Sequence, residues 1–293
     1  MNNWLNLEKS VCAVTGALGG MGTEICREFA RNGADVVLLD LDGEKVKAAA
    51  AELSEEFGVH AEGYRMNACD EAEVQAAVDA AVADFGRVDV LVNTAGILRF
   101  APMEDLPLSD WNDVINVNLT GYFITSQRFG RQMIKQGAGR LVHISTAASY
   151  SPETFSGVYS STKAGVNMLS KMLAAEWGPY GVRSNCVCPC FVKTPMSANF
   201  YADPEVEKSR SRLIATRRIG EVSDIANAVM FLASTRSDFT TGDAIKVDGG
   251  FSNMMGDLTA KPGGRRAYAE NYLKSRGVAL WTDEAGVKTP SDQ

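Results

Sequence analysis

A phenol and an amine four residues apart, Tyr159 and Lys163 in the segment YSSTK, are the side chains of this sequence best suited to move a proton. On a helix, this spacing places both groups on one face. A phenol titrates near pH ~10, and a neighbouring ammonium stabilises the phenolate and lowers the phenol pKa. The pair could therefore act as general acid and base in carbonyl and alcohol chemistry. The alternative is an ordinary pair on an amphipathic helix, so the interpretation depends on further motifs.

A glycine-rich turn, TGALGGMG at residues 15–22, follows a short apolar run and leads into a segment with helical apolar spacing. Glycines let the backbone approach a phosphate closely, and free N–H groups at a helix N-terminus face its charge. The glycine-rich sequence motif of dinucleotide-binding folds depends on this geometry. The glycines here, Gly16, Gly20 and Gly22, have a wider first gap than G-x-G-x-x-G. The alternative is a tight turn that binds nothing.

An acidic residue, Asp40, ends the next predicted strand, 18 residues after Gly22. A carboxylate there can accept hydrogen bonds from the adenosine ribose hydroxyls of NAD. It would also repel the additional phosphate of NADP, and no basic residue occupies Ala17, Leu18 or Leu41 to compensate that phosphate. The sequence therefore predicts NAD as the cofactor, the alternative being a solvated carboxylate in a turn.

The elements that must position these groups are strand-like apolar runs that alternate with helix-like segments. This pattern predicts an α/β fold, a single-domain Rossmann-like doubly wound parallel sheet of about seven strands with helices on both faces. Strands are expected at 11–15, 36–40, 61–66, 88–93, 140–145, 182–188 and 244–247. Helices are expected at 44–57, 70–85, 109–136 with Ser109 as N-cap, 157–177 and 223–234.

With the NTAG segment at 93–96 and the NVNL segment at 116–119, these motifs resemble the short-chain dehydrogenase/reductase family over about residues 7–250. The branch is the one with a TGxxxGxG turn and a YxxxK pair. The resemblance implies hydride exchange between C4 of a nicotinamide and a carbon that bears oxygen, in a secondary alcohol or ketone. It assigns the following residues to the cofactor: Gly16, Leu18, Gly19, Gly20, Met21, Gly22, Asp40, Leu41, Asn67, Ala68, Asn93, Ala95, Gly96, Val117, Tyr159, Lys163, Pro189, Cys190, Val192 and Thr194.

The same resemblance implies a catalytic tetrad. Tyr159 would exchange the proton with the substrate oxygen, and Lys163 would also hold the nicotinamide ribose. Asn118 would position a water that relays the proton. The family's serine lies 13 residues before the tyrosine, which assigns its role to Thr146 and leaves Ser145 as the alternative. Neighbours on a strand point to opposite faces, so the two hydroxyls are not equivalent.

Composition favours a protein that acts on small molecules. A net charge of −7 argues against nucleic acid as a partner. The first residues lack a signal-peptide pattern, and no apolar run approaches the length of a membrane span. Six cysteines, mostly inside predicted strands and helices, suit a reducing compartment. We therefore expect a cytoplasmic location and no membrane association.

Three thiols, Cys186, Cys188 and Cys190, stand within five residues and could ligate zinc. A second ligand cluster is absent from the sequence, and its histidines are His60 and His143 alone, so we expect no metal. His143 follows the pattern of a buried core histidine. Cys190 replaces the glycine usual in the family beside the nicotinamide, where it would narrow the site or make it sensitive to thiol reagents.

Substrate specificity is left open by the sequence. The segment 195–218 is the expected lid. Its aromatic residues and methionine permit an apolar substrate such as a steroid or an acyl chain. Its basic residues permit an anionic substrate such as a hydroxy acid, the alternative being a solvated face: Lys208, Arg210, Arg212 and Arg217. Polyols and sugars also remain possible substrates. Candidate substrate contacts lie in loops beyond the carboxyl edge of the sheet: Leu98, Phe100, Ala147, Ser149, Tyr150, Phe155, Met196, Phe200 and Tyr201.

The catalytic domain is expected to span residues 1–250, and residues 251–293 form an extension past the usual family end. The extension, with a helix expected at 267–275 and Trp281 beyond it, is either a polar tail or docks on a neighbouring subunit or the pocket. The family resemblance implies a homotetramer, or a dimer, built on the helices at 109–136 and 157–177. Two further functions remain as alternatives, a non-catalytic NAD-binding regulator and an epimerase or dehydratase that uses NAD internally.

Overall fold

The computed structural model of this protein describes residues 4–254 and 263–277. The chain divides into two compact units, Met1–Ser252 and Asn253–Gln293. The second unit contains α9 (Arg265–Ser275), and Trp281 lies outside the described residues. No helix within the described residues has the length and apolar character needed to span a bilayer.

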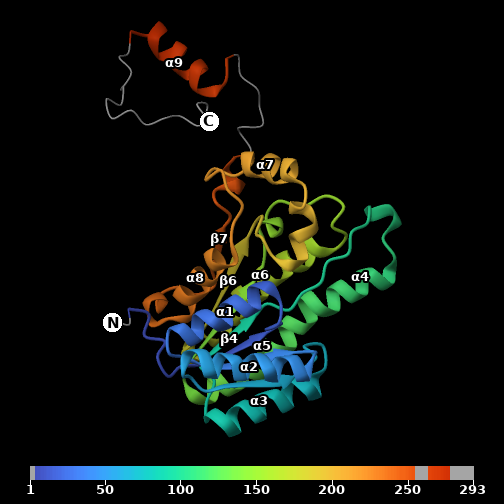
Figure 1. Ribbon diagram of the computed structural model, residues 1–293, viewed down its shortest axis with the longest axis vertical. Helices are drawn as coiled ribbons and strands as arrows, with labels where there is room; N and C mark the ends of the chain where they lie inside the picture. The colour runs from blue at the N-terminus through green and yellow to red at the C-terminus, as the bar shows by residue number, and fades with distance from the viewer. Residues whose placement is uncertain (1–3, 255–262, 278–293) are drawn as a thin grey trace. The chain divides into compact units, whose positions relative to one another are not determined.

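The first unit is built on one sheet of seven parallel strands in the order β3-β2-β1-β4-β5-β6-β7 (Figure 1). Strands β1 and β4 are buried along their whole length, as a sheet covered on both faces requires. The predicted Rossmann-like fold is therefore confirmed. The strand bounds are β1 (Val11–Thr15), β2 (Asp35–Asp40), β3 (Ala61–Arg65), β4 (Val90–Asn93), β5 (Gly139–Ile144), β6 (Val182–Pro189) and β7 (Ala244–Val247).

Helices cover both faces of this sheet. Alternate strand residues pack against α1, α2 and α8 on one face and against α3, α5 and α6 on the other. Local signals set several helix ends: Asp42 and Asp70 cap N-termini, and Gly58 and Gly86 end helices in the left-handed region. The bounds are α1 (Gly20–Arg31), α2 (Gly43–Phe57), α3 (Glu71–Phe85), α4 (Leu108–Ile115), α5 (Gly121–Gln136), α6 (Tyr159–Trp177), α7 (Pro204–Arg212) and α8 (Val222–Ala233).

The single helix predicted over 109–136 is wrong in two respects. The observed helix α4 begins at Leu108 after Pro107, so Ser109 lies inside the helix and is not its N-cap. A π-helical turn, η2 (Asn116–Thr120), also separates α4 from α5. The Asn118 side chain explains this turn, because its amide makes two hydrogen bonds of 2.8 Å with the backbone N–H and carbonyl of Ile97. A tertiary contact thus sets the winding here.

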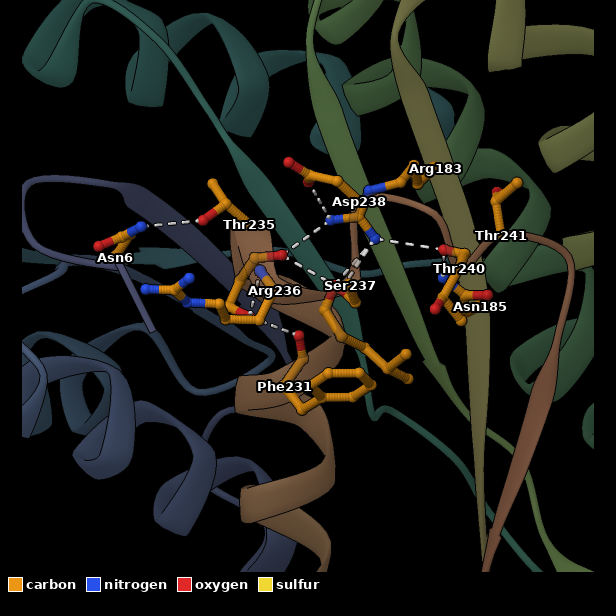
Figure 2. Close-up of polar contacts among 12 residues, drawn as sticks. Asn6, Arg183, Asn185, Phe231, Thr235, Arg236, Ser237, Asp238, Thr240 and Thr241 are labelled. Carbon is orange, nitrogen blue, oxygen red and sulfur yellow. Dashed lines mark hydrogen bonds and ion pairs between the residues drawn. The ribbon is translucent and has the colours of Figure 1, made fainter. Parts of the chain in front are cut away.

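The route into β7 is fixed by a largely buried arginine on β6, shown in Figure 2. One terminal nitrogen of the Arg183 guanidinium donates to the Leu232 carbonyl at 3.2 Å and the Ser237 hydroxyl at 3.1 Å. The other donates to the Ser234 carbonyl at 2.9 Å. These bonds satisfy carbonyls at the end of α8 and hold the turn η6 (Thr235–Ser237) against the sheet.

Candidate active site

The glycine turn lies between β1 and α1, and its close packing against neighbouring backbone requires glycine at two positions. Gly16 has φ +64°, and a Cβ there would lie 2.9 Å from Ala95 Cα. A Cβ at Gly22 would lie 2.1 Å from the Gly16 carbonyl oxygen. No side chain caps the N-terminus of α1 at Gly19, and its first turn holds no acidic residue. The first amides of α1 are therefore suited to an anion.

This turn borders a cavity of about 500 Å³ along the carboxyl ends of β1, β2 and β4. Within the described residues, its lining contains no lysine or arginine. Residues not predicted from the sequence, Thr94 and Cys69 among them, also line it. The predicted cofactor residues that line it are Gly16, Leu18, Gly19, Gly20, Met21, Gly22, Asp40, Leu41, Asn67, Ala68, Ala95, Gly96, Val117 and Thr194.

The carboxylate of Asp40 is held at the wall of the cavity by two backbone amides. Leu18 N–H donates to one oxygen at 3.0 Å, and Leu41 N–H donates to the other at 2.7 Å. The first bond ties the end of β2 to the glycine turn. Each oxygen keeps a lone pair for a further donor, so the carboxylate is fixed in position and still able to accept from ligand hydroxyls.

Asn93, although predicted to contact the cofactor, is almost fully buried beneath the cavity and is not among its lining residues. Its side-chain oxygen accepts from Thr125 Oγ1 at 2.9 Å, and its nitrogen contacts Ser126 Oγ and His143 Nδ1 at 3.2 Å each. These bonds join β4, β5 and α5. The side chain of Asn93 therefore supports the site from below, and His143 is a core histidine whose pKa burial lowers to about 3.

Tyr159 and Lys163 lie together at the start of α6, as their spacing predicts. The Lys163 ammonium is 5.9 Å from the centroid of the Tyr159 ring. A Cβ at Gly96, in the cavity lining, would lie 3.7 Å from Lys163 Nζ and 3.3 Å from Asn118 Oδ1. Because Gly96 has no side chain, the Lys163 ammonium and the Asn118 amide can lie this close to a residue that lines the cavity.

Burial dominates the titration of both reacting groups. It raises the pKa of Tyr159 to about 12, and the charge of Glu153 raises that pKa further. It lowers the pKa of Lys163 to about 8, against smaller raising contributions from Cys186 and Cys188. The expected lowering of the phenol pKa by the lysine is thus not met in this structure. At neutral pH, Tyr159 is a phenol and Lys163 a cation.

The two candidate hydroxyls at the end of β5 differ in their surroundings. Ser145 is buried, and its hydroxyl donates to the backbone carbonyl of Lys163 at 3.1 Å. Thr146 is half-buried, accepts from Ala148 N–H at 3.2 Å and donates to the Pro189 carbonyl at 3.4 Å. The hydroxyl of Thr146 is therefore the more accessible of the two for a substrate.

The expected lid contains η5 (Pro195–Tyr201) and α7. Phe200 meets Phe100 edge-to-face at 6.2 Å, so η5 contacts the loop after β4. The guanidinium of Arg210 lies 4.6 Å from the Phe200 ring and 4.8 Å from the Phe191 ring. Arg210 has no carboxylate partner among the described residues and contacts the hydroxyl of Tyr201 at 3.5 Å. Its donors are thus largely available for a ligand.

The cysteines on and after the second half of β6 are thiols at neutral pH. Burial raises the pKa of both Cys186 and Cys190 to about 12. Within residues 4–254 and 263–277, no cluster of three candidate ligands could hold a metal ion.

A dinucleotide fits the residues of this cavity. The uncapped N-terminus of α1 suits a pyrophosphate, and Asp40 suits a ribose diol. A Cβ at Gly20 would meet Pro195 Cδ at 2.5 Å, so the lid begins directly beside the glycine turn. Lys163, which shares the first turns of α6 with Tyr159, lies close to Gly96.

Comparison with known proteins agrees with this arrangement. A family model described as enoyl-(acyl carrier protein) reductase matches residues 16–252. D-threitol dehydrogenase of Mycolicibacterium smegmatis is 38% identical over 246 residues, which are 84% of this chain and 94% of that protein.

Among solved structures, a gluconate 5-dehydrogenase from Burkholderia cenocepacia in complex with NADP and tartrate superposes with a TM-score of 0.82 at 32% identity, over 86% of this chain and 98% of that one. An NAD⁺-bound xylitol dehydrogenase superposes with a TM-score of 0.78 at 31% identity, over 84% of this chain and 100% of that one.

Proposed function

This chain belongs to the short-chain dehydrogenase/reductase family, and from that premise we propose that it is an NAD-dependent oxidoreductase that interconverts a secondary alcohol and a ketone. One observation carries the proposal: Lys163, buried one helical turn from the half-buried Tyr159, comes close at Gly96 to a cavity whose glycine turn and carboxylate suit a dinucleotide. A regulator without turnover would not need an acid–base pair at this place.

NAD rather than NADP is supported by the charges of the cavity. Asp40 is fixed by two amides, and the described lining contributes no cation against the additional phosphate. The related structures include both cofactors, so the preference rests on this chain's own residues.

In the proposed reaction, the nicotinamide supplies the hydride to a carbonyl carbon or accepts it from an alcohol carbon. Tyr159 donates its phenolic proton to the carbonyl oxygen in reduction and takes the alcohol proton in oxidation. Thr146 donates a hydrogen bond to the same oxygen, where negative charge develops. Lys163, a cation at neutral pH, stabilises the phenolate that Tyr159 becomes after donation. Asn118, held on both sides by Ile97, orients the water that returns the proton.

A polyhydroxylated substrate is supported by the names of the relatives, which include D-threitol dehydrogenase, gluconate 5-dehydrogenase and xylitol dehydrogenase. Arg210 in the lid would donate to hydroxyls or to a carboxylate of such a molecule, and the phenyl rings beside it hold the guanidinium in place. Polyols and sugar acids are therefore the first substrates to test.

The test is a panel of polyols, sugar acids, hydroxy acids, steroids and acyl thioesters, each with NAD and NADP, with reduced nicotinamide measured by absorbance. We expect turnover of a polyol or sugar acid with NAD. Tight NAD binding without turnover of any compound would instead support the regulator, and conversion of substrate without net change in the cofactor would support the epimerase.

We also propose a homotetramer, or a dimer, in the cytoplasm. Phe123 on α5 and Met168 and Met172 on α6 are large apolar side chains that lie about half exposed. Such a surface suits burial against a second copy. Light scattering in solution would test the assembly, and a monomer at micromolar concentration would contradict it. Whether the extension at 251–293 docks on a neighbour or the pocket stays a prediction.

A further inference from the structure

The buried ammonium of Lys163 lies beside a second tyrosine, Tyr122, that is not part of the predicted tetrad. Lys163 Nζ donates to the Tyr122 hydroxyl at 3.1 Å and to the Ile144 carbonyl at 2.8 Å. The Tyr122 hydroxyl in turn donates to the Ile144 carbonyl at 3.1 Å. Three polar groups from α5, α6 and β5 thus form a closed triangle. Tyr122 is 1% exposed and Lys163 is 3% exposed, so protein oxygens take the place of water around this cation.

This cation has no counter-ion in the described part of the chain. The titratable groups that face Lys163 are Tyr122 and Tyr159, His143 on β5, and the thiols Cys186 and Cys188 on β6. Burial keeps each of them neutral at pH 7: it raises the pKa values of the phenols and thiols and lowers that of His143. A buried charge without a partner is costly unless oriented dipoles stabilise it. The hydroxyl of Tyr122 and the carbonyl of Ile144 are such dipoles.

The triangle also fixes where the ammonium points. Two of its three N–H groups are used by Tyr122 and Ile144. A Cβ at Gly96, which lines the cavity, would lie 3.7 Å from Nζ, so the ammonium lies close to the cavity lining. The third N–H is therefore left for a ligand or for Tyr159.

We propose that Tyr122 is a positioning residue of the proposed alcohol dehydrogenase, which holds Lys163 in its charged form and aims its third N–H at the cavity. The inference rests on the proposed function for its catalytic consequence, while the contact between the two side chains can be tested without turnover. Tyr122 itself exchanges no proton, because its own proton is donated to Ile144.

The first experiment measures kcat/KM against pH for the wild type, Tyr122→Phe and the control Tyr64→Phe. The phenylalanine keeps the ring and removes the acceptor. The hydroxyl is a hydrogen-bond acceptor for a charged group, so without it Lys163 should lose its proton about one to two pH units lower. We expect the alkaline limb of the kcat/KM profile to move to lower pH by that amount. Near pH 8, kcat/KM of Tyr122→Phe should be roughly tenfold lower than that of the wild type. Tyr64→Phe, which removes a hydroxyl paired with Asp84 on α3 and not bonded to Lys163, should leave the limb in place.

The second experiment needs no substrate. Unfolding free energies of the wild type, Tyr122→Phe, Lys163→Met and the double variant form a cycle that isolates the pair. The folded pKa of Lys163, about 8, lies below its ordinary value, so the unfolded chain binds the additional proton and stability rises with pH between about 8 and 10.5. We expect a favourable coupling between the two residues at pH 7 that falls by at least half at pH 10, where Lys163 is neutral.

The outcomes separate this inference from the proposed function. No coupling at pH 7, or an unmoved alkaline limb with only a loss of stability, overturns the role of Tyr122 even if the enzyme oxidises polyols. A coupling that disappears at high pH supports the contact even if the wild type turns over no alcohol, in which case the proposed function alone fails.

Discussion

Replacing Asp40 by asparagine tests the cofactor preference most directly, because the change removes a charge and keeps the shape. The carboxylate accepts from Leu18 N–H at 3.0 Å and Leu41 N–H at 2.7 Å, so its place at the cavity wall is fixed. Two unit charges about 5 Å apart repel by about 3 kcal/mol at an effective dielectric constant of ~20. Solvent screening of this half-buried group leaves roughly half of that.

The expected effects on the two cofactors have opposite signs. Loss of about 1.5 kcal/mol of repulsion raises kcat/KM with NADP about tenfold. Loss of a charged acceptor for ribose hydroxyls costs about 1.5 kcal/mol and lowers kcat/KM with NAD about tenfold. The ratio of the two values therefore changes about 100-fold. Because both values come from one variant, the ratio cancels any general loss of stability.

The assay is the initial rate of nicotinamide reduction with each cofactor at a fixed alcohol concentration. Asp35→Asn is the matched control: Asp35 lies at the opposite end of β2 and accepts from His60 N–H at 2.9 Å. It should leave the ratio unchanged. A wild type that prefers NADP, or an Asp40→Asn variant with the wild-type ratio, would refute the reasoning.

Three further predictions concern the acid, the hydroxyl and the glycine turn. Tyr159→Phe should lower kcat by about 10²–10⁴-fold and leave NADH binding, followed by fluorescence, close to wild type; substantial turnover would contradict the acid–base role. Thr146→Ala should lower kcat by about 10²–10³-fold, and more than Ser145→Ala, whose side chain is buried; the reverse order would reassign the role. Gly22→Ala places a Cβ 2.1 Å from a carbonyl oxygen and should lower Tm and abolish NADH binding, whereas Gly178→Ala, with nothing within 4 Å, should do neither; normal NADH titration of Gly22→Ala would show that the turn is not the phosphate site.

The sheet was predictable because its strands are short apolar runs and two of its helices, α2 and α3, begin at capping residues. Val11–Thr15 and Val90–Asn93 are buried on both faces, and burial of that kind is visible as continuous apolar sequence. Asp42 and Asp70 cap the helices that follow them, as such residues do in isolated peptides. These elements depend on local chemistry, which the sequence carries directly.

The features that could not be predicted from the sequence depend on contacts between distant segments. Asn93 looked like a cofactor contact but is turned into a buried network with Thr125 and His143. The phenol pKa of Tyr159 was expected to fall, yet burial, which spacing does not reveal, raises it. Tyr122 was missed altogether. One signal could have indicated it. Tyr122 stands four residues after Asn118, and residues with this spacing share one face of a helix.

The π-helical turn at Asn116–Thr120 makes the length of this stretch as important as its composition. A π turn (i→i+5) holds one residue more than an α turn, so deleting one residue here would restore regular winding and leave α4 and α5 in nearly the same orientation. The change would fall on the turn itself, where Asn118 makes both of its bonds to Ile97. Substitutions in this stretch change one contact each, whereas a single deletion would shift Asn118 against Tyr122, which stays bonded to Lys163 from α5.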